Sequence, residues 1–119
     1  MHFAAKKGHA EVIKLLIDAG AQIGARDKDG DTPLSIAAEY GRNAVVQLLL
    51  AAGACPKDTA RHEKTPLMLA AEYGHYQVVQ ELLSVSNIDA QSKCSCTALH
   101  YACQYGHESV VRLLIKNGA

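Results

Sequence analysis

The feature that most limits how this chain can fold is a segment that recurs at nearly constant spacing. Its three best copies run from Asp31 to Gly41, from Lys64 to Gly74 and from Cys96 to Gly106. The threonines near the start of these copies lie 33 and then 32 residues apart, at Thr32, Thr65 and Thr97. A period of this length indicates one supersecondary unit per repeat, stacked on its neighbours to bury a shared core.

Each full copy begins with residues that favour the start of a short helix. Thr32 suits the N-cap, and Pro33 falls at the first helical position, where the missing N–H is not needed. The pair Ala37-Ala38 is small enough to let neighbouring helices approach closely. Gly41 is predicted to end the helix, because glycine enters the left-handed backbone region easily.

A second helix is predicted after each of these glycines, with apolar pairs four residues apart on one face. The pairs are Val45-Val46 with Leu49-Leu50, Val78-Val79 with Leu82-Leu83, and Val110-Val111 with Leu114-Ile115. About a dozen polar, turn-prone residues then lead to the next threonine, which is enough for an extended arm. A partial unit at residues 2–9 fits one period upstream of the first full copy.

Taken together, these motifs resemble the ankyrin-repeat family over residues 1–119. The resemblance implies an all-α ankyrin-repeat solenoid of helix-turn-helix units joined by β-hairpin-like arms. It divides a single domain into units of about 1–26, 27–59, 60–91 and 92–119, the outer two partial. Met1 stands where the other units have leucine, and the last helix has an internal pattern, so we expect a piece of a longer array.

The arm tips depart from the repeat pattern in two units. Glycine occupies the first tip, at Gly30, whereas Glu63 and Ser95 stand at the matching positions. A residue with a side chain there either adopts a positive φ or changes the turn. The third unit also lacks its Gly-Ala end, reading Ser84 to Asp89, and is one residue short.

The balance of charges argues against several classes of partner. Lys plus Arg equals Asp plus Glu at twelve each, so the chain has no net attraction for a phosphate backbone or an anionic lipid surface. No apolar run approaches the roughly eighteen residues needed to span a bilayer. We therefore expect no nucleic-acid partner, no membrane insertion and a monomeric fragment.

The family resemblance implies that the concave surface, formed by the short helices and the arms, binds partners. Just before the inter-helix glycines this surface would display Glu39-Tyr40, Glu72-Tyr73 and Gln104-Tyr105. Units stacked about 10 Å apart would align Tyr40, Tyr73 and Tyr105 into what we call the tyrosine row. Tyrosine is enriched at interface hot spots, which favours a binding role. The alternative is that each tyrosine only packs on the next unit.

The arm tips provide a second set of candidate contacts. Their charged residues are Lys28, Asp29 and Asp31 in the first arm, then Arg61, His62 and Lys64, then Lys93. The charge thus changes from mixed acidic to basic along the array, and a partner could read that change as orientation. The alternative is that these are solvated loop charges without a partner.

A metal site is the sharpest competing interpretation. Cys94, Cys96, His100 and Cys103 have side chains that zinc accepts. Their spacing, however, lacks the gap of about two to four residues typical of paired zinc cysteines. Cys103 fills an alanine position, and the resemblance implies a structural role near the helix start for His100. The sequence therefore predicts no metal and no cofactor.

Catalysis is also not expected. Candidate nucleophiles such as Ser35 and Cys103 have no partner histidine and acid at equivalent positions, and there is no glycine-rich phosphate loop. The predicted function is non-catalytic protein–protein interaction through the concave face. Two alternatives stay open: a substrate-recruiting domain of a larger enzyme or ligase complex, and a zinc- or redox-responsive module built on the Cys94–Cys103 cluster. Four clustered cysteines do not suit a disulfide framework, which favours the cytoplasm or nucleus.

Overall fold

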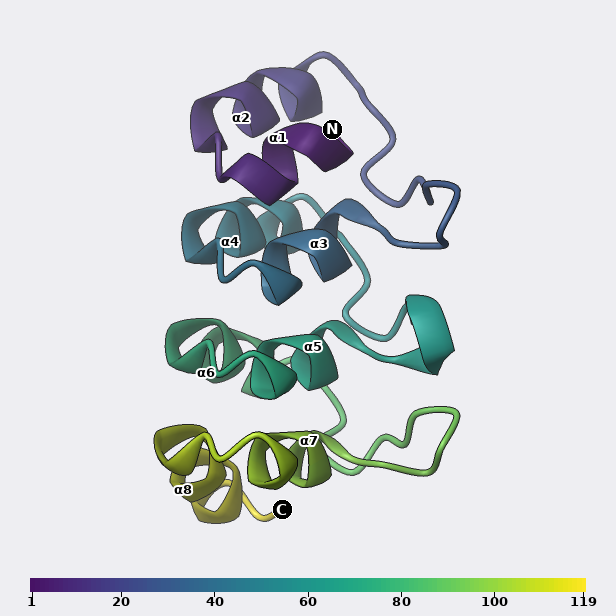
Figure 1. Ribbon diagram of the computed structural model, residues 1–119. Coiled ribbons are helices and arrows are strands. Elements are labelled where there is room, and N and C mark those ends of the chain that lie inside the picture. Colours follow the sequence, from purple (N-terminus) through teal and green to yellow (C-terminus); the bar gives the residue numbers. More distant parts are fainter.

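The computed structural model describes residues 1–119 as a stack of four antiparallel helix pairs. The pairs are α1 (His2–Lys7) with α2 (Ala10–Asp18), α3 (Pro33–Glu39) with α4 (Asn43–Ala51), α5 (Pro66–Glu72) with α6 (Tyr76–Leu83), and α7 (Ala98–Gln104) with α8 (Glu108–Lys116). The odd-numbered helices form an inner row next to the arms, and the even-numbered helices form an outer row (Figure 1). The stack measures 39 Å along its longest axis.

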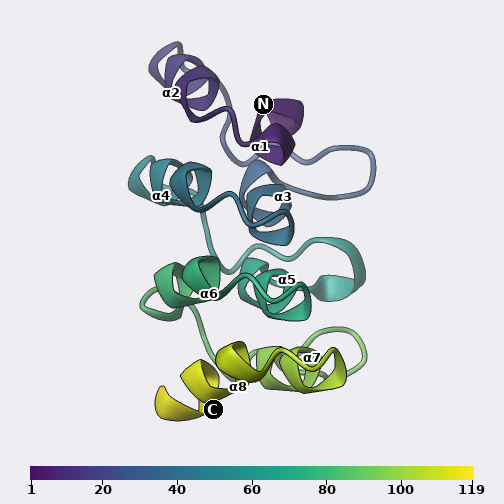
Figure 2. The same cartoon turned by 60° about the vertical axis from the view of Figure 1, so that its left-hand side comes forward.

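The three connections between successive pairs project to the same side of the stack (Figure 2). They contain no strands, and the second arm carries one short 3-10 turn, η1 (Arg61–Glu63). Each arm reverses through a backbone hydrogen bond, such as the one from Asp27 N–H to Asp31 C=O at 2.9 Å. The predicted all-α solenoid with hairpin-like arms is confirmed. None of its helices combines the length and the apolar character needed to cross a bilayer.

The inner helices begin where the threonines predict. Thr32 Oγ1 accepts a hydrogen bond from Ser35 N–H at 3.1 Å, and Ser35 Oγ accepts one from Thr32 N–H at 2.9 Å. Thr65 caps α5 in the same way, through Met68 N–H at 3.3 Å. These bonds satisfy N–H groups that a helix end otherwise leaves without a partner. The three full inner helices therefore begin at the same position of the repeat. Their C-terminal ends then come at equivalent positions of successive units.

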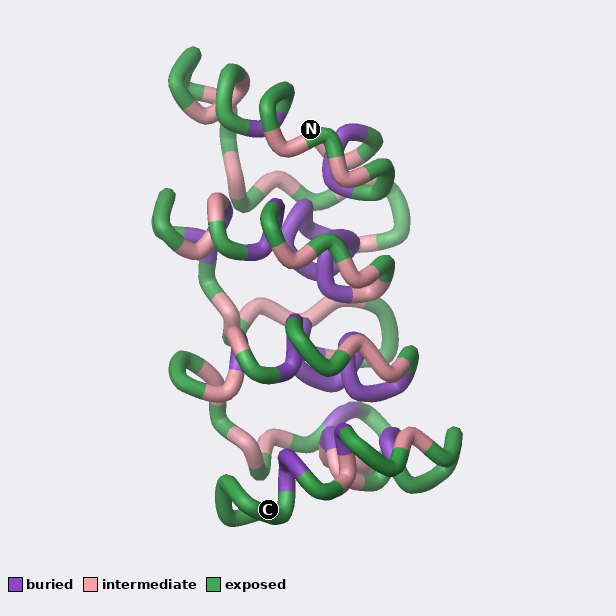
Figure 3. Tube along the Cα trace, turned by 90° about the vertical axis from the view of Figure 1, so that its left-hand side faces the viewer, coloured by how far each residue is buried: buried purple, intermediate pink, exposed green.

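The core lies between the two rows and between successive pairs (Figure 3). The paired alanines of the inner row are fully buried at Ala37, Ala38, Ala70 and Ala71. The apolar pairs of the outer row bury Val45, Val46, Val78, Val79 and Leu82 to the same degree, with at most 1% exposure. Small side chains in the inner row allow close approach, and branched side chains of the outer row fill the remaining space.

The residues with side chains at two of the arm tips adopt a positive φ, which was one of the two conformations that the sequence allowed. Glu63 and Ser95 have φ angles of 58° and 65°, close to the left-handed conformation that Gly30 adopts at φ 83°. His62 also has a positive φ of 59°. The turn is thus preserved in all three arms, and two of them hold a side chain in a backbone region that disfavours it.

Candidate interaction surface

The inner helices and the arms enclose two hollows of opposite charge on the concave face. The hollow near the start of the chain, here called the acidic hollow, has a volume of ≈ 260 Å³. Its polar lining is His2, Lys6, Asp27, Asp29, Asp31, Glu39, Tyr40 and Arg61. The four carboxylates come from one unit, from the first arm and the end of α3, and the units before and after it contribute Lys6 and Arg61.

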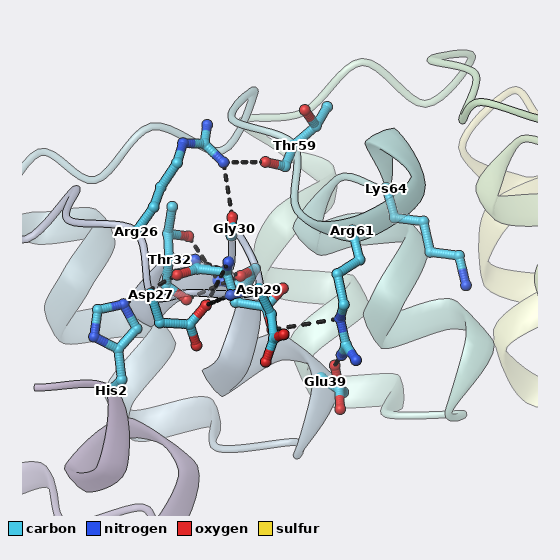
Figure 4. Close-up of polar contacts among 12 residues, drawn as sticks. His2, Arg26, Asp27, Asp29, Gly30, Thr32, Glu39, Thr59, Arg61 and Lys64 are labelled. Atoms are coloured by element: carbon cyan, nitrogen blue, oxygen red, sulfur yellow. Dashed lines mark hydrogen bonds and ion pairs between the residues drawn. The ribbon is translucent and has the colours of Figure 1, made fainter.

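Arg61 closes one side of the acidic hollow (Figure 4). Its guanidinium donates from Nη2 to Glu39 Oε1 at 2.8 Å, and its Nε lies 3.4 Å from Asp31 Oδ2. Partial burial acts to lower the pKa of Arg61, but the charges of Asp31 and Glu39 outweigh it and raise that pKa. Arg61 therefore ties the second arm to the unit before it.

Asp31 retains an unused acceptor although it contacts Arg61. Its side chain is only 9% exposed, and its Oδ1 atom is buried without a hydrogen-bond partner. A buried carboxylate oxygen without a donor is costly to the folded state.

Asp27 has a local structural role in the same hollow. Its Oδ1 accepts hydrogen bonds from the N–H groups of Asp29 and Asp31, both at 2.9 Å. Partial burial acts to raise the pKa of Asp27, and these two donors, together with the charges of His2 and Arg61, bring that pKa below its ordinary value. Asp29 is exposed, and its carboxylate lies close to those of Asp27 and Asp31.

The second hollow, here called the basic hollow, has a volume of ≈ 360 Å³. It is lined by His62, Lys64, Lys93, Cys94, Tyr101, Gln104 and Tyr105. Lys64 Nζ lies 2.7 Å from Glu72 Oε1 and 4.8 Å from the centre of the Tyr101 ring. Glu72 is only 8% exposed, and its charge is balanced within the chain by Lys64.

The tyrosine row is largely open to solvent. Tyr40, Tyr73 and Tyr105 are 40%, 50% and 53% exposed. Tyr40 lines the acidic hollow and Tyr105 the basic hollow, and Tyr73 stands in the unit between them. Burial raises the pKa of Tyr73, and the neighbouring charges of Glu72 and Glu39 raise it further. The row thus offers three half-exposed rings along one face.

The structure divides the predicted contact residues into two groups. Those held in ion pairs within the chain are Asp31, Glu39, Arg61, Lys64 and Glu72. Those that are exposed and outside these ion pairs are Asp29, Tyr40, His62, Tyr73, Lys93, Gln104 and Tyr105. This second group is the one that an incoming protein could reach first.

Sequence reasoning missed several lining residues. Tyr101 occupies the position that Ile36 and Leu69 fill in the other units. This exchange of an aliphatic residue for tyrosine could have marked it as a candidate contact residue. Phe3 is 69% exposed beside the acidic hollow and was also missed. A larger depression of ≈ 660 Å³ lies outside, between α6 and α8, but only two of its seven lining residues are apolar.

The four candidate zinc ligands do not gather. Cys94 and Cys96 touch, with their Sγ atoms 2.9 Å apart, but neither His100 nor Cys103 joins them in a metal-sized group. His100 Nδ1 accepts a hydrogen bond from Thr97 N–H at 2.9 Å, which is the structural role expected for it. The three groups that do lie close together are Asp27, Asp29 and Asp31, and there Asp27 bonds the turn itself.

A row of stacked helix pairs with hollows between its arms and inner helices defines a helical-repeat solenoid that presents a concave face. A family model described as "Ankyrin repeats (3 copies)" matches residues 1–60 and 55–119. The chain therefore belongs to the ankyrin-repeat family.

Three curated proteins show local similarity to this chain. Protein phosphatase 1 regulatory subunit 12A of Mus musculus is 54% identical over 37 residues, which cover 31% of this chain and 4% of that protein. The Rattus norvegicus protein of the same name gives the same figures. Ankyrin repeat-containing protein P1E11.10 of Schizosaccharomyces pombe is 42% identical over 36 residues, or 30% of this chain and 17% of that protein. Each match spans little more than one repeat.

Proposed function

We propose that this chain is a non-catalytic module that binds a partner protein or peptide along its concave face. The observation that carries the proposal is the tyrosine row, three half-exposed rings that run between two hollows of opposite charge. Aromatic side chains of this kind supply large contact area at small conformational cost. Membership of the ankyrin-repeat family supports the same use of this face.

The charges of the two hollows suggest the polarity of the partner. In the acidic hollow four carboxylates face the charges of Lys6 and Arg61, and Asp31 Oδ1 lacks a donor. An arginine or lysine of the partner would complement this hollow. In the basic hollow Lys93 and His62 have no ion-pair partner, so an acidic side chain would suit it. We infer that the partner segment lies with its basic part on α1–α3 and its acidic part on α5–α7.

A second candidate role is recruitment of a substrate to an enzyme in the same chain or complex. One relative is named as a regulatory subunit of a protein phosphatase, which supports this reading. Because that match covers only 37 residues, substrate recruitment has less support than partner binding. For either role we propose the cytoplasm or nucleus, because Cys55, Cys94 and Cys103 are exposed free thiols.

Photo-crosslinking from both faces tests the proposal. A photoreactive phenylalanine analogue is placed at Tyr73 on the concave face, and in a second variant at the exposed Gln77 on α6. Both proteins are exposed to the same cell extract, and the crosslinked proteins are identified by mass spectrometry. We expect a discrete partner from position 73 that is absent from position 77. Equal crosslinking from both positions, or none from position 73, would contradict the concave face as the binding surface.

A further inference from the structure

Two cysteines meet at the tip of the third arm. The arm closes with hydrogen bonds from Ser92 N–H to Cys96 C=O and from Ser95 N–H to Ser92 C=O, both 2.9 Å long. Ser95, between the two cysteines, has a φ of 65°, which bends the backbone and brings both side chains to the same side. The Cys94 and Cys96 Sγ atoms are consequently 2.9 Å apart. A disulfide bond is about 2.05 Å long, so a short movement suffices to join them.

The surroundings of the two thiols make them chemically unequal. The Cys94 and Cys96 Sγ atoms share a hydrogen bond, and Ser92 Oγ and Tyr101 Oη lie 3.3 and 3.5 Å from the Cys94 sulfur atom. These contacts, the one with Cys96 foremost, lower the pKa of Cys94 to about 6. Holding that bond raises the pKa of Cys96. At neutral pH the pair is therefore one thiolate beside one thiol, which is the arrangement needed for attack followed by resolution.

The position of Cys94 also favours an anionic reaction partner. Cys94 lines the basic hollow, where Lys93 and His62 face it from two successive arms. Lys64 also lines this hollow, with its Nζ atom over the Tyr101 ring. The only carboxylate paired with these cations is Glu72. A small disulfide that carries net negative charge, as glutathione disulfide does, is attracted to such a site.

We propose that Cys94 and Cys96 form a reversible dithiol–disulfide site that exchanges with small anionic disulfides, with Cys94 as the attacking sulfur. The Cys94 thiolate attacks one sulfur of glutathione disulfide, forms a mixed disulfide and releases one glutathione thiolate. That thiolate takes the proton of the Cys96 thiol, and Cys96 then attacks Cys94 Sγ and expels the second glutathione. Two protein thiols are oxidised to one disulfide, and one glutathione disulfide is reduced to two glutathione molecules.

The exchange needs no partner protein, although Cys94 lines the basic hollow in which the proposed partner's acidic part would lie. A three-residue loop held by a strained, exposed disulfide is readily reduced again, which makes the exchange reversible. The chain also supplies internal controls. Cys55 and Cys103 are equally open to solvent, and neither thiol makes a hydrogen bond.

Alkylation of the reduced chain tests the unequal thiols. A brief pulse of iodoacetamide at pH 6 is followed by proteolysis and mass spectrometry of each cysteine peptide. About half of Cys94 is thiolate at this pH, against roughly 0.3% of an ordinary thiol, while the lower basicity of its sulfur reduces its intrinsic reactivity by roughly tenfold. We expect Cys94 to react about tenfold faster than Cys103. Equal rates for the two cysteines would overturn the proposal.

Equilibration of the whole chain with reduced and oxidised glutathione tests the exchange itself. After acid quenching we expect a disulfide within the peptide that holds Cys94 and Cys96, and its loss when reduced glutathione is restored. Cys96→Ser removes the resolving thiol and should instead accumulate one glutathione on residue 94. Cys55→Ser and Cys103→Ser should leave the exchange unchanged. Glutathione adducts on Cys55 and Cys103 without the Cys94–Cys96 disulfide would contradict the site.

Discussion

His75 Nε2 lies 2.8 Å from the backbone carbonyl oxygen of Glu39, in the preceding repeat. A carbonyl oxygen can only accept, so His75 carries its proton on Nε2 and donates it. The imidazole ring thereby covers Gly41, where a Cβ atom would stand 2.5 Å from His75 Nδ1. The glycine at this position is needed for its positive φ of 71° and also for the close approach of the next unit's histidine.

The same contact recurs at each junction of the stack. His107 Nε2 lies 2.8 Å from Glu72 C=O, and Arg42 Nε donates to Lys6 C=O at 2.9 Å. Arginine thus replaces histidine at the first junction and keeps the hydrogen bond. His9 occupies the equivalent place in the first unit, where no preceding repeat stands in the structure. In the second, third and fourth units, the residue after the inter-helix glycine therefore fastens its unit to the one before it.

We predict that His75→Ala destabilises the chain by about 1–2 kcal/mol, because it removes this bond and leaves the Glu39 carbonyl without it. Urea unfolding followed by circular dichroism measures the change. His9→Ala is the matched control, and it should change the free energy of unfolding by less than about 0.5 kcal/mol. If both variants lost the same stability, the inter-repeat contact would not be the cause.

Leu82→Ala should have a larger effect on stability. Leu82 is 0% exposed on α6, whereas Leu15 on α2 is 68% exposed. Truncation of a fully buried leucine costs roughly 2–5 kcal/mol, and solenoid units depend on their neighbours, so we expect the whole stack to unfold earlier. Leu15→Ala is the control and should be close to neutral. An unchanged thermal midpoint for Leu82→Ala would refute this account of the outer-row core.

The helices and core could be predicted because they depend on local patterns that repeat. Thr32 and Thr65 cap their helices through bonds to residues three positions later in the sequence. The burial of Val78 and Val79 follows from the spacing of the apolar residues within one helix. The inter-repeat bonds were harder to foresee. Arg42 and His75 have different side chains, and their shared role becomes visible only when the preceding carbonyl is placed beside them.

The candidate surface was predictable in position but not in its internal pairing. The exposed tyrosines lie where the repeat places them, whereas Arg61 pairs with residues of the preceding unit and Lys64 pairs with Glu72 at the far end of α5. Glu72 illustrates the difference. Its place beside Tyr73 follows from the repeat, but its burial depends on how the second arm folds over α5 and delivers Lys64.

Glu63→Gly should stabilise the chain by roughly 0.5–1 kcal/mol, because glycine adopts a φ of 58° without the steric cost that a side chain incurs. Gly30→Ala is the reciprocal variant at the matching tip, where φ is 83°, and should be destabilising. Chemical unfolding of both variants measures these changes. A loss of stability in Glu63→Gly would show that the Glu63 side chain contributes more than its backbone strain costs.

The lowered pKa of Asp27 predicts a contribution to acid sensitivity. Its folded pKa lies below the unfolded value, so the unfolded chain binds more protons in this range and stability falls as the pH falls. The contribution is present above the unfolded pKa of about 3.9 and is lost as the pH passes through the lower folded value. Asp27→Asn keeps an oxygen acceptor for the turn but does not titrate there, so its stability should fall less between pH 5 and 2. Asp18→Asn, at the exposed end of α2, is the matched control, because it makes the same substitution at a side chain that forms no hydrogen bond or ion pair.

The last prediction concerns the tyrosine row. Tyr73 stands between Tyr40 and Tyr105 and is 50% exposed, so its ring is available to a partner before binding. A central aromatic ring that loses solvent on binding is a typical hot spot, and its removal commonly weakens affinity by at least about 2 kcal/mol. We expect Tyr73→Ala to weaken binding of the partner captured from position 73 by about thirtyfold or more, measured by fluorescence anisotropy with the crosslinked segment as a labelled peptide. Lys93→Ala, at the edge of the basic hollow, should have a smaller effect that shrinks further as salt is added. Unfolding curves of both variants separate binding from folding, because a half-exposed ring contributes little to the core. If Tyr73→Ala is as stable as the parent and binds the peptide equally well, the tyrosine row is not the contact, and the outer depression between α6 and α8 becomes the next surface to vary.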